Sequence, residues 1–167
     1  SEAKVGTFKL AMYQGNLNKT LYFAGDMDGY YYATTEDYVD ATDIVVAKSA
    51  NDGFYTLSFV NAAGATKYLA IKANGEHTNV LIVDEAADWG WDADIKAFYT
   101  MVGTDKTYLG TRNDKTYTTM SAVASKFATT NFIARACTMV TADYTFVAHS
   151  EAKVGTFKLA MYQGNLN

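Results

Sequence analysis

The sequence predicts an all-β protein on the basis of three observations. Short runs of residues alternate between apolar and polar with the two-residue period of a strand, and Gly, Asn and Asp residues typical of turns separate them. Tyrosine and phenylalanine, which favour strands, are abundant at 13 and 9 residues. Proline is absent, and no long stretch has the apolar spacing of a helix. These features together predict a fold built from short strands.

Twelve strand-like runs can be distinguished, and they form three groups of four. The groups share an order, because an aromatic residue opens the first run of each and a run centred on a tyrosine comes second. A turn and two further runs complete each group. The runs are residues 7–14, 20–26, 29–36 and 41–49, then 53–60, 66–72, 79–85 and 88–95, and finally 97–103, 106–112, 115–122 and 130–138.

Corresponding aromatic residues mark the three groups. Given as opening aromatic and then tyrosine, they are Phe8 and Tyr22, Phe54 and Tyr68, Phe98 and Tyr108. Three units of four strands predict a β-trefoil, in which hairpins close a short barrel and so remove exposed sheet edges. A β-sandwich is the alternative, because it also uses short strands at this spacing. In the trefoil, we expect the three tyrosines to occupy equivalent core positions.

The first eighteen residues, SEAKVGTFKLAMYQGNLN, occur again without change at residues 150–167. We therefore divide the chain into a β-trefoil domain, residues 1–140, and a second part, residues 141–167, which comprises a connector and the repeated strand. A single domain can use this strand once, so we expect one copy to link domains. The origins we consider are a piece of a longer array of repeats, a strand donated to a neighbouring molecule, and a duplication made by design.

One face of the repeated strand is suited to a protein core. Large apolar residues alternate with small or polar ones in residues 7–14, as in a half-buried strand. Left free, the second copy would expose the same apolar row and promote association. We therefore expect residues 156–163 to complete the first strand of the next domain, which makes a head-to-tail polymer. The predicted linking residues are Phe8, Leu10, Met12, Phe157, Leu159 and Met161.

Composition argues against several classes of function. The net charge of −4 disfavours nucleic acid and anionic membranes as partners. No apolar run approaches the roughly 20 residues of a membrane-spanning helix, so membrane insertion is not expected. Cys137 is the only cysteine, and the two histidines, His77 and His149, stand far from it in the sequence. No pairing of a nucleophile with a base is suggested, and we do not expect an enzyme.

The stretch DEAADWGWDAD, residues 84–94, combines acidic residues with Trp89 and Trp91. Asp84, Asp88 and Asp92 are candidate ligands for Ca²⁺, since that ion prefers carboxylate oxygens. The two tryptophans are a candidate platform for a sugar. We favour a simpler interpretation, in which the acids form a solvated loop and the tryptophans cap the barrel. On that interpretation the protein has no cofactor.

Asn18 begins the sequence Asn-Lys-Thr, which is the acceptor pattern for N-glycosylation. It lies between the first two predicted strands. A glycan attached in such a turn would not disturb the core, so Asn18 is a candidate glycosylation site.

Four stretches, residues 8–35, 42–46, 66–71 and 107–122, together resemble a repeat module of very large secreted or wall-attached proteins of clostridial Gram-positive bacteria. The motif KTLYFAG followed by YATT is the most specific part of the likeness, which covers about residues 5–135. The resemblance implies an extracellular or cell-surface location, many copies per assembly and no enzymatic activity. Sugar-binding β-trefoils usually carry Gln-x-Trp in each unit, and neither Gln14 nor Gln163 begins that motif.

Two functions follow as expectations. The first is a structural subunit of an extracellular or cell-surface fibre, whose partners are further copies of the same chain joined head to tail. The second is a β-trefoil that binds carbohydrate or a host surface and is displayed in a tandem array. A structural subunit should place apolar residues where neighbouring domains meet, whereas a lectin should show an aromatic-floored pocket near Trp89 or Trp91.

Overall fold

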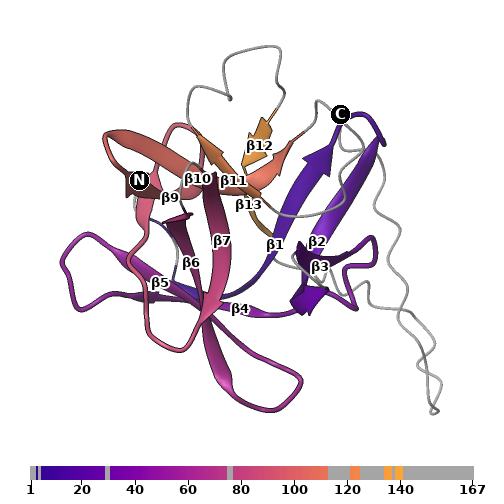
Figure 1. Ribbon diagram of the computed structural model, residues 1–167. Helices are drawn as coiled ribbons and strands as arrows, with labels where there is room; N and C mark the ends of the chain where they lie inside the picture. Colours follow the sequence, from indigo (N-terminus) through magenta and orange to yellow (C-terminus); the bar gives the residue numbers. More distant parts are fainter. Residues whose placement is uncertain are drawn as a thin grey trace, which may run out of the picture.

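The computed structural model describes residues 3, 5–28, 31–74, 77–112, 121–124, 134–136 and 138–140. All regular structure in these residues is β-strand, so the predicted all-β class is confirmed (Figure 1). The described part of the chain contains no helix of the length and hydropathy required to cross a membrane. Residues 141–167, which hold the predicted connector and the repeated strand, lie outside the described residues, as do Cys137 and His149.

Each of the twelve predicted runs corresponds to a strand or to part of one. The last run, residues 130–138, overlaps two short strands. The run at residues 115–122 overlaps only the start of its strand within the described residues. The strands are β1 (Gly6–Gln14), β2 (Lys19–Asp28), β3 (Tyr31–Thr35), β4 (Ile44–Lys48), β5 (Tyr55–Val60), β6 (Thr66–Asn74), β7 (His77–Val83), β8 (Gly90–Asp92), β9 (Ala97–Val102), β10 (Asp105–Arg112), β11 (Ser121–Ala124), β12 (Ala134–Ala136) and β13 (Thr138–Val140).

The described strands form two antiparallel sheets. The larger has eight strands in the order β3-β2-β1-β4-β5-β6-β7, with β13 paired to β1 beside this path. The smaller has five strands in the order β11-β10-β9-β8, with β12 paired to β10. An isolated bridge between Tyr55 and Trp89 joins the two sheets, because each residue's backbone N–H donates to the other's carbonyl, at 2.9 and 2.8 Å.

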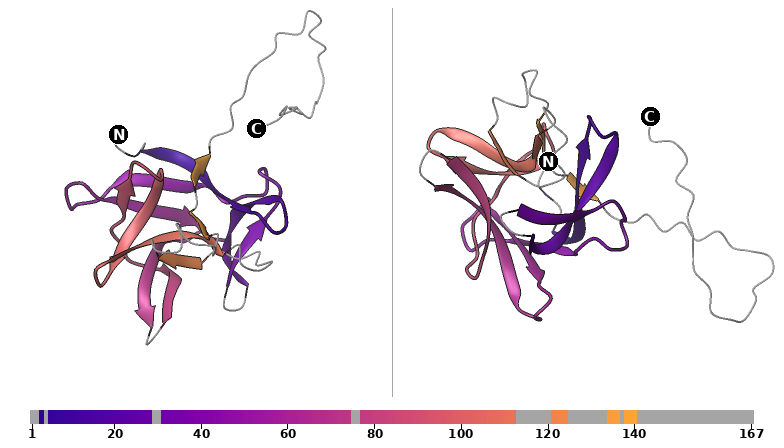
Figure 2. Two further views of the ribbon diagram at one scale, coloured as in Figure 1. Left: turned by 90° about the horizontal axis from the view of Figure 1, so that it is seen from above. Right: turned by 45° about the vertical axis from the view of Figure 1, so that its right-hand side comes forward.

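Figure 2 shows the strands of the two sheets from two further directions. One hydrophobic core includes side chains from both sheets. Among the described side chains, β1, β2, β4, β5, β6 and β7 contribute aliphatic residues to it. The core reaches the smaller sheet through Trp89, Phe98 and Leu109. The rings of Phe23 and Phe59 meet edge-on within it, with centroids 5.1 Å apart. The core therefore holds the two sheets together as one packed unit.

The prediction that a tyrosine fills the core position of each second strand is wrong for two of the three groups. Tyr22 and Tyr68 are only half-buried, whereas Tyr108 is buried. Successive side chains of a strand point to opposite faces. In β2, β6 and β10, the second strands of the three groups, the residue that follows the tyrosine lies on the core face. These core residues, with exposed fractions of 0%, 1% and 2%, are Phe23, Leu69 and Leu109.

A similar shift of one residue applies at the start of β5. Phe54, predicted to open this strand, precedes it and is 41% exposed. Tyr55 begins the strand and is 6% exposed, because its backbone bridges Trp89 and its ring packs against Phe98 at 5.9 Å. The other two opening aromatics, Phe8 and Phe98, are buried.

Candidate functional site

The position of β1 in the sheet is the candidate site, because the sequence of this strand occurs twice in the chain. β1 pairs in turn with three strands: β4 at residues 6–8, β13 at residues 9–11 and β2 at residues 11–14. Because every residue from 6 to 14 has a partner on a neighbouring strand, β1 forms ladder hydrogen bonds along its whole length. Removal of β1 would therefore leave unpaired backbone groups on all three neighbours.

The side chains of β1 fill the core on one face. Phe8, Leu10 and Met12 have exposed fractions of 9%, 1% and 2%, and all three belong to the core cluster. The opposite face was expected to be open, but Ala11 is also buried at 5%. A further part of the chain must therefore cover the outer face of the strand.

At Lys9 the cover is provided by the loop of residues 36–43, which joins β3 to β4 and which we call the clasp. The ammonium group of Lys9 is 2.7 Å from Asp43 Oδ1, donates to the carbonyl oxygen of Ala41 and lies 5.7 Å from the ring centroid of Tyr38. As a result, the Lys9 side chain is only 12% exposed. Long charged side chains are rarely covered to this extent unless they are paired.

Contacts with β2 hold the clasp in place. The backbone N–H of Thr42 donates to the carbonyl of Phe23 at 2.8 Å, and the rings of Tyr38 and Tyr22 meet edge-on at 5.6 Å. Burial raises the pKa of Tyr22 above its ordinary value, and the nearby Tyr38 and Asp37 act in the same direction. The clasp is thus packed against the sheet along both β1 and β2.

The tight turn between β1 and β2 places Asn18 on the surface. Asn18 has a φ of 52°, a left-handed conformation that asparagine adopts more readily than most residues. Its backbone N–H donates to Gly15 O at 3.2 Å, and its Oδ1 accepts a hydrogen bond from the hydroxyl of Tyr13 at 2.5 Å. The side chain is exposed. Glycosylation of Asn18 stays a prediction.

The candidate calcium ligands have separate protein partners. Asp84 forms an ion pair with Lys67, and Asp88 accepts hydrogen bonds from Ser49 Oγ and from Asn51 Nδ2, the latter at 2.5 Å. The hydrogen bonds from Ser49 and Asn51 lower the pKa of Asp88. Two of the three carboxylates, those of Asp84 and Asp88, therefore have protein groups as partners.

Asp92 is the most enclosed of the three, with an exposed fraction of 9%. Lys106 Nζ donates to Asp92 Oδ2 at 2.8 Å and the Tyr108 hydroxyl donates to the same oxygen at 2.7 Å. The hydrogen bond from Lys106 is the main reason that the pKa of Asp92 falls to about 2. Burial and the bond to Asp92 raise the pKa of Tyr108. No three Asp, Glu, His or Cys residues of the described ranges meet in a way that could hold a metal ion.

The two tryptophans lie in or against the core. Trp89 is 0% exposed, and its indole N–H donates to the carbonyl of Leu69 at 2.9 Å. Trp91 is partly buried and packs edge-on against Phe98, with ring centroids 5.0 Å apart. The ring of Trp89 therefore has no face left for a sugar, which corrects the predicted platform at that residue. The other interpretation, in which the tryptophans cap a barrel, stays a prediction.

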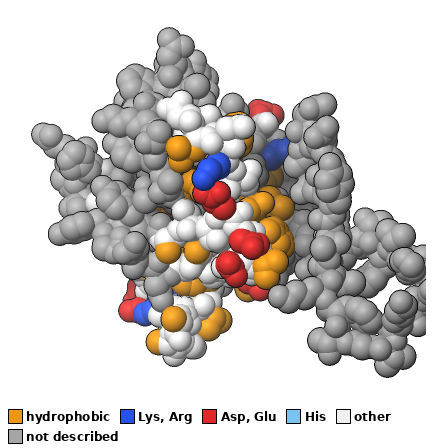
Figure 3. Space-filling model, turned by 90° about the vertical axis from the view of Figure 1, so that its right-hand side faces the viewer, with side chains coloured by type: hydrophobic (Ala, Val, Ile, Leu, Met, Phe, Trp, Pro, Cys, Tyr) orange, Lys and Arg blue, Asp and Glu red, His pale blue; other side chains and the backbone are white. Residues whose placement is uncertain are grey.

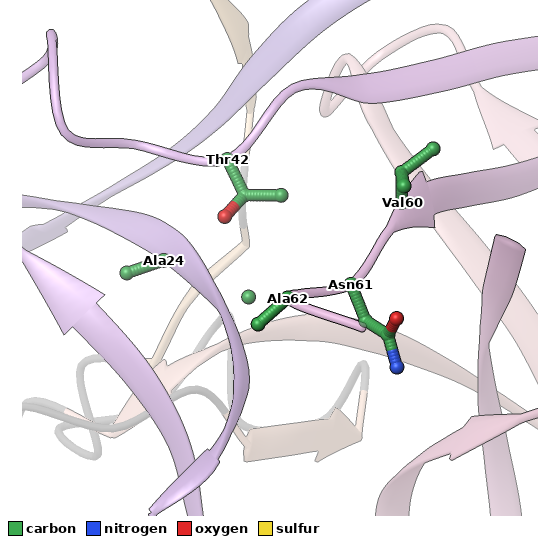
Figure 4. Close-up of a pocket in the computed structure, with 6 residues that line it drawn as sticks. Ala24, Thr42, Val60, Asn61 and Ala62 are labelled. Atoms are coloured by element: carbon green, nitrogen blue, oxygen red, sulfur yellow. The ribbon is translucent and has the colours of Figure 1, made fainter. Parts of the chain in front are cut away.

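A shallow depression lies between β2, the end of the clasp and the turn after β5 (Figure 4). Small side chains line it, and a neighbouring depression shares Thr42 and Val60 with it. No exposed aromatic ring lines either one, since Phe59, which contributes to the second, is 2% exposed. On the side of the molecule seen in Figure 3, hydrophobic side chains lie beside acidic ones. Neither depression has the aromatic floor expected of a sugar site.

Comparison of the chain with protein-family models, curated proteins and solved structures finds no match.

Proposed function

We propose that this protein is a structural repeating subunit of an extracellular or cell-surface fibre that assembles head to tail through its duplicated strand. In this proposal residues 155–163 occupy the β1 position of the next domain. The supporting observation is that β1 is paired with three strands and buries one face in the core. Since residues 155–163 repeat β1 residue for residue, they suit the same position. The extracellular location is supported by the resemblance to clostridial surface-protein repeats.

The burial of the second copy would stabilise the joint. Fully burying a large apolar side chain contributes roughly 1.5–3 kcal/mol, so the equivalents of Phe8, Leu10 and Met12 together would contribute roughly 5–9 kcal/mol. The resident strand and its copy have the same side chains, so neither sequence binds the β1 position better than the other. Which of the two occupies that position therefore depends on protein concentration and on how the domains are connected. A contact between two different surfaces propagates as a filament.

We also propose that the strands form a β-trefoil. Each unit contains a hairpin made by its second and third strands, β2-β3, β6-β7 and β10-β11. The last strand of each unit pairs with the first strand of the following unit: β4 with β5, β8 with β9, and β13 back with β1. This cyclic pattern is what a barrel closed by three similar units requires.

The register of the tyrosines further supports the three-fold alignment. Tyr22 pairs with Ala11, Tyr68 with Ser58 and Tyr108 with Tyr99. In every unit, therefore, the tyrosine of the second strand lies opposite the first strand of the same unit. Carbohydrate binding, the alternative function, has no comparable support, because Trp89 is buried and the depressions lack exposed aromatic rings.

The proposal can be tested on the full-length chain by changing only the second copy. Serine at Phe157, Leu159 and Met161 should abolish assemblies that light scattering after size exclusion and electron microscopy detect in the unmodified protein. The matched control is Thr156→Ser with Tyr162→Ser, because the equivalent residues, Thr7 and Tyr13, are exposed. This control should assemble normally. Equal assembly of both variants would refute the linking role.

A further inference from the structure

We infer that the clasp recognises the lysine of the strand in the β1 position, so that Asp43 of one copy binds Lys158 of the next. This inference rests on the proposed function. Lys158 is the equivalent of Lys9, which is the residue that the clasp contacts in the resident strand. The clasp would therefore bind one specific side chain, Lys158, of an incoming strand.

Three chemically different groups of the clasp converge on a single ammonium group. They are the carboxylate of Asp43, the carbonyl of Ala41 and the ring of Tyr38. A carboxylate, a carbonyl oxygen and the face of an aromatic ring all attract a cation. Together they form a small cation-binding surface directed at one position of β1.

Lys9 differs from the other lysines that form ion pairs in the described residues. Its side chain is 12% exposed, against 46% for Lys19, 26% for Lys67 and 42% for Lys106. Surface ion pairs contribute little to stability or selectivity, and covered ones contribute more. Asp43 itself is 65% exposed, so the covered partner of this pair is the lysine, whose ammonium group also contacts Ala41 and Tyr38.

The chemistry of the clasp determines which strands it would reject. A neutral residue at the Lys9 position would leave the Ala41 carbonyl and the Asp43 carboxylate without their cation. A glutamate there would place a carboxylate in the covered Lys9 position, against the Ala41 carbonyl and the Asp43 carboxylate, and like charges repel. In this chain the sequence Phe-Lys-Leu occurs only at residues 8–10 and 157–159. The occupant that fits is therefore the resident strand or a second copy of this chain.

The test uses full-length variants, with assembly measured by sedimentation velocity at one protein concentration. Lys158→Glu should weaken association at least about tenfold, because it places a carboxylate in the covered lysine position, facing the Ala41 carbonyl and Asp43. Lys153→Glu is the matched control, because it makes the same charge change in the second copy but outside residues 155–163. It should associate like the unmodified protein. Lys9 is intact in both variants, so at a protein concentration too low for association their melting temperatures should equal that of the unmodified chain.

A second variant reverses the pair. Asp43→Lys combined with Lys158→Glu should regain association, because a lysine at position 43 attracts the glutamate of the incoming strand and repels the resident Lys9. Failure to regain it in a double variant that still melts cooperatively would overturn the inference. If the double variant does not fold, the comparison of Lys158→Glu with Lys153→Glu decides alone.

The two proposals can fail separately. If the two single variants associate equally while deletion of residues 150–167 prevents association, the clasp does not read Lys158 but the linking strand is retained. If the deletion variant associates as the unmodified protein does, the proposed function fails and the inference fails with it.

Discussion

Replacing Phe23 with alanine should destabilise the protein strongly, because this ring is fully buried in the core. Phe23 is 0% exposed and packs edge-on against Phe59, with centroids 5.1 Å apart at an angle of 81°. Truncation of a buried phenylalanine to alanine costs about 3–5 kcal/mol, through lost burial and the cavity that remains. We therefore expect Phe23→Ala to lower the free energy of unfolding by about 3–5 kcal/mol.

The matched control is the neighbouring residue, Tyr22. Its side chain is half-buried, and its ring contact is with Tyr38 of the clasp at 5.6 Å. Loss of an aromatic pair costs about 0.5–1.5 kcal/mol beyond burial, so Tyr22→Ala should cost about 1–2 kcal/mol. Equal losses for the two variants would refute the assignment of the core position to Phe23.

Urea unfolding followed by tryptophan fluorescence is a suitable assay, because Trp89 is fully buried in the folded state. The titration should be repeated at two protein concentrations, since association between copies would add to the apparent stability. A concentration-independent midpoint identifies the stability of the single domain. A loss below about 1 kcal/mol for Phe23→Ala would contradict the core described above.

Two further predictions concern the smaller sheet. The pKa of Asp92 in the folded protein, about 2, lies below its ordinary value of 3.8. Its ionised form therefore stabilises the fold above about pH 4, and this contribution is lost as the pH falls through about 2. Asp92→Asn should lower the melting temperature at pH 7, and the difference from the unmodified protein should narrow between about pH 4 and pH 2; a difference independent of pH would contradict this. Separately, a Cβ at Gly90 would lie 2.4 Å from Tyr99 Cζ, so Gly90→Ala should cost about 1–3 kcal/mol. A double-mutant cycle with Tyr99→Ala should reduce that cost, and additive costs would rule out the steric clash.

The strands were predictable because their signals are local. Alternation in residues such as Phe8, Leu10 and Met12 needs no knowledge of distant parts of the chain. Turn residues between the runs, such as Gly15 and Asn18 after β1, mark where each strand ends. The same logic failed at single positions, since period-two alternation does not say which of two adjacent aromatic residues takes the core. Phe23 was missed beside Tyr22, and Tyr55 beside Phe54, for this reason.

The candidate site was only partly visible in the sequence. The duplication of residues 1–18 singles out β1 and its apolar face without any structure. The clasp could not be found in this way, because the hydrogen bond from Lys9 to Ala41 joins residues 32 positions apart. A lysine between Phe8 and Leu10 reads as an ordinary solvated residue until the loop that covers it is seen. The signal that could have pointed to it is Asp43, directly before β4, but the sequence holds many other acids.

The sequence by itself thus determined the strand class, the positions of the strands along the chain and the presence of a second β1 sequence, all of which depend on local periodicity or on identity of residues. Tertiary structure decided which faces are covered and which charges are paired. Trp89 shows the difference, because its burial depends on a bridge to Tyr55 and on the carbonyl of Leu69, 20 residues away. Asp84, Asp88 and Asp92 are close in sequence but are paired with Lys67, Ser49 and Lys106. Burial and charge pairing are set by non-local packing, which the spacing of residues along one strand does not specify.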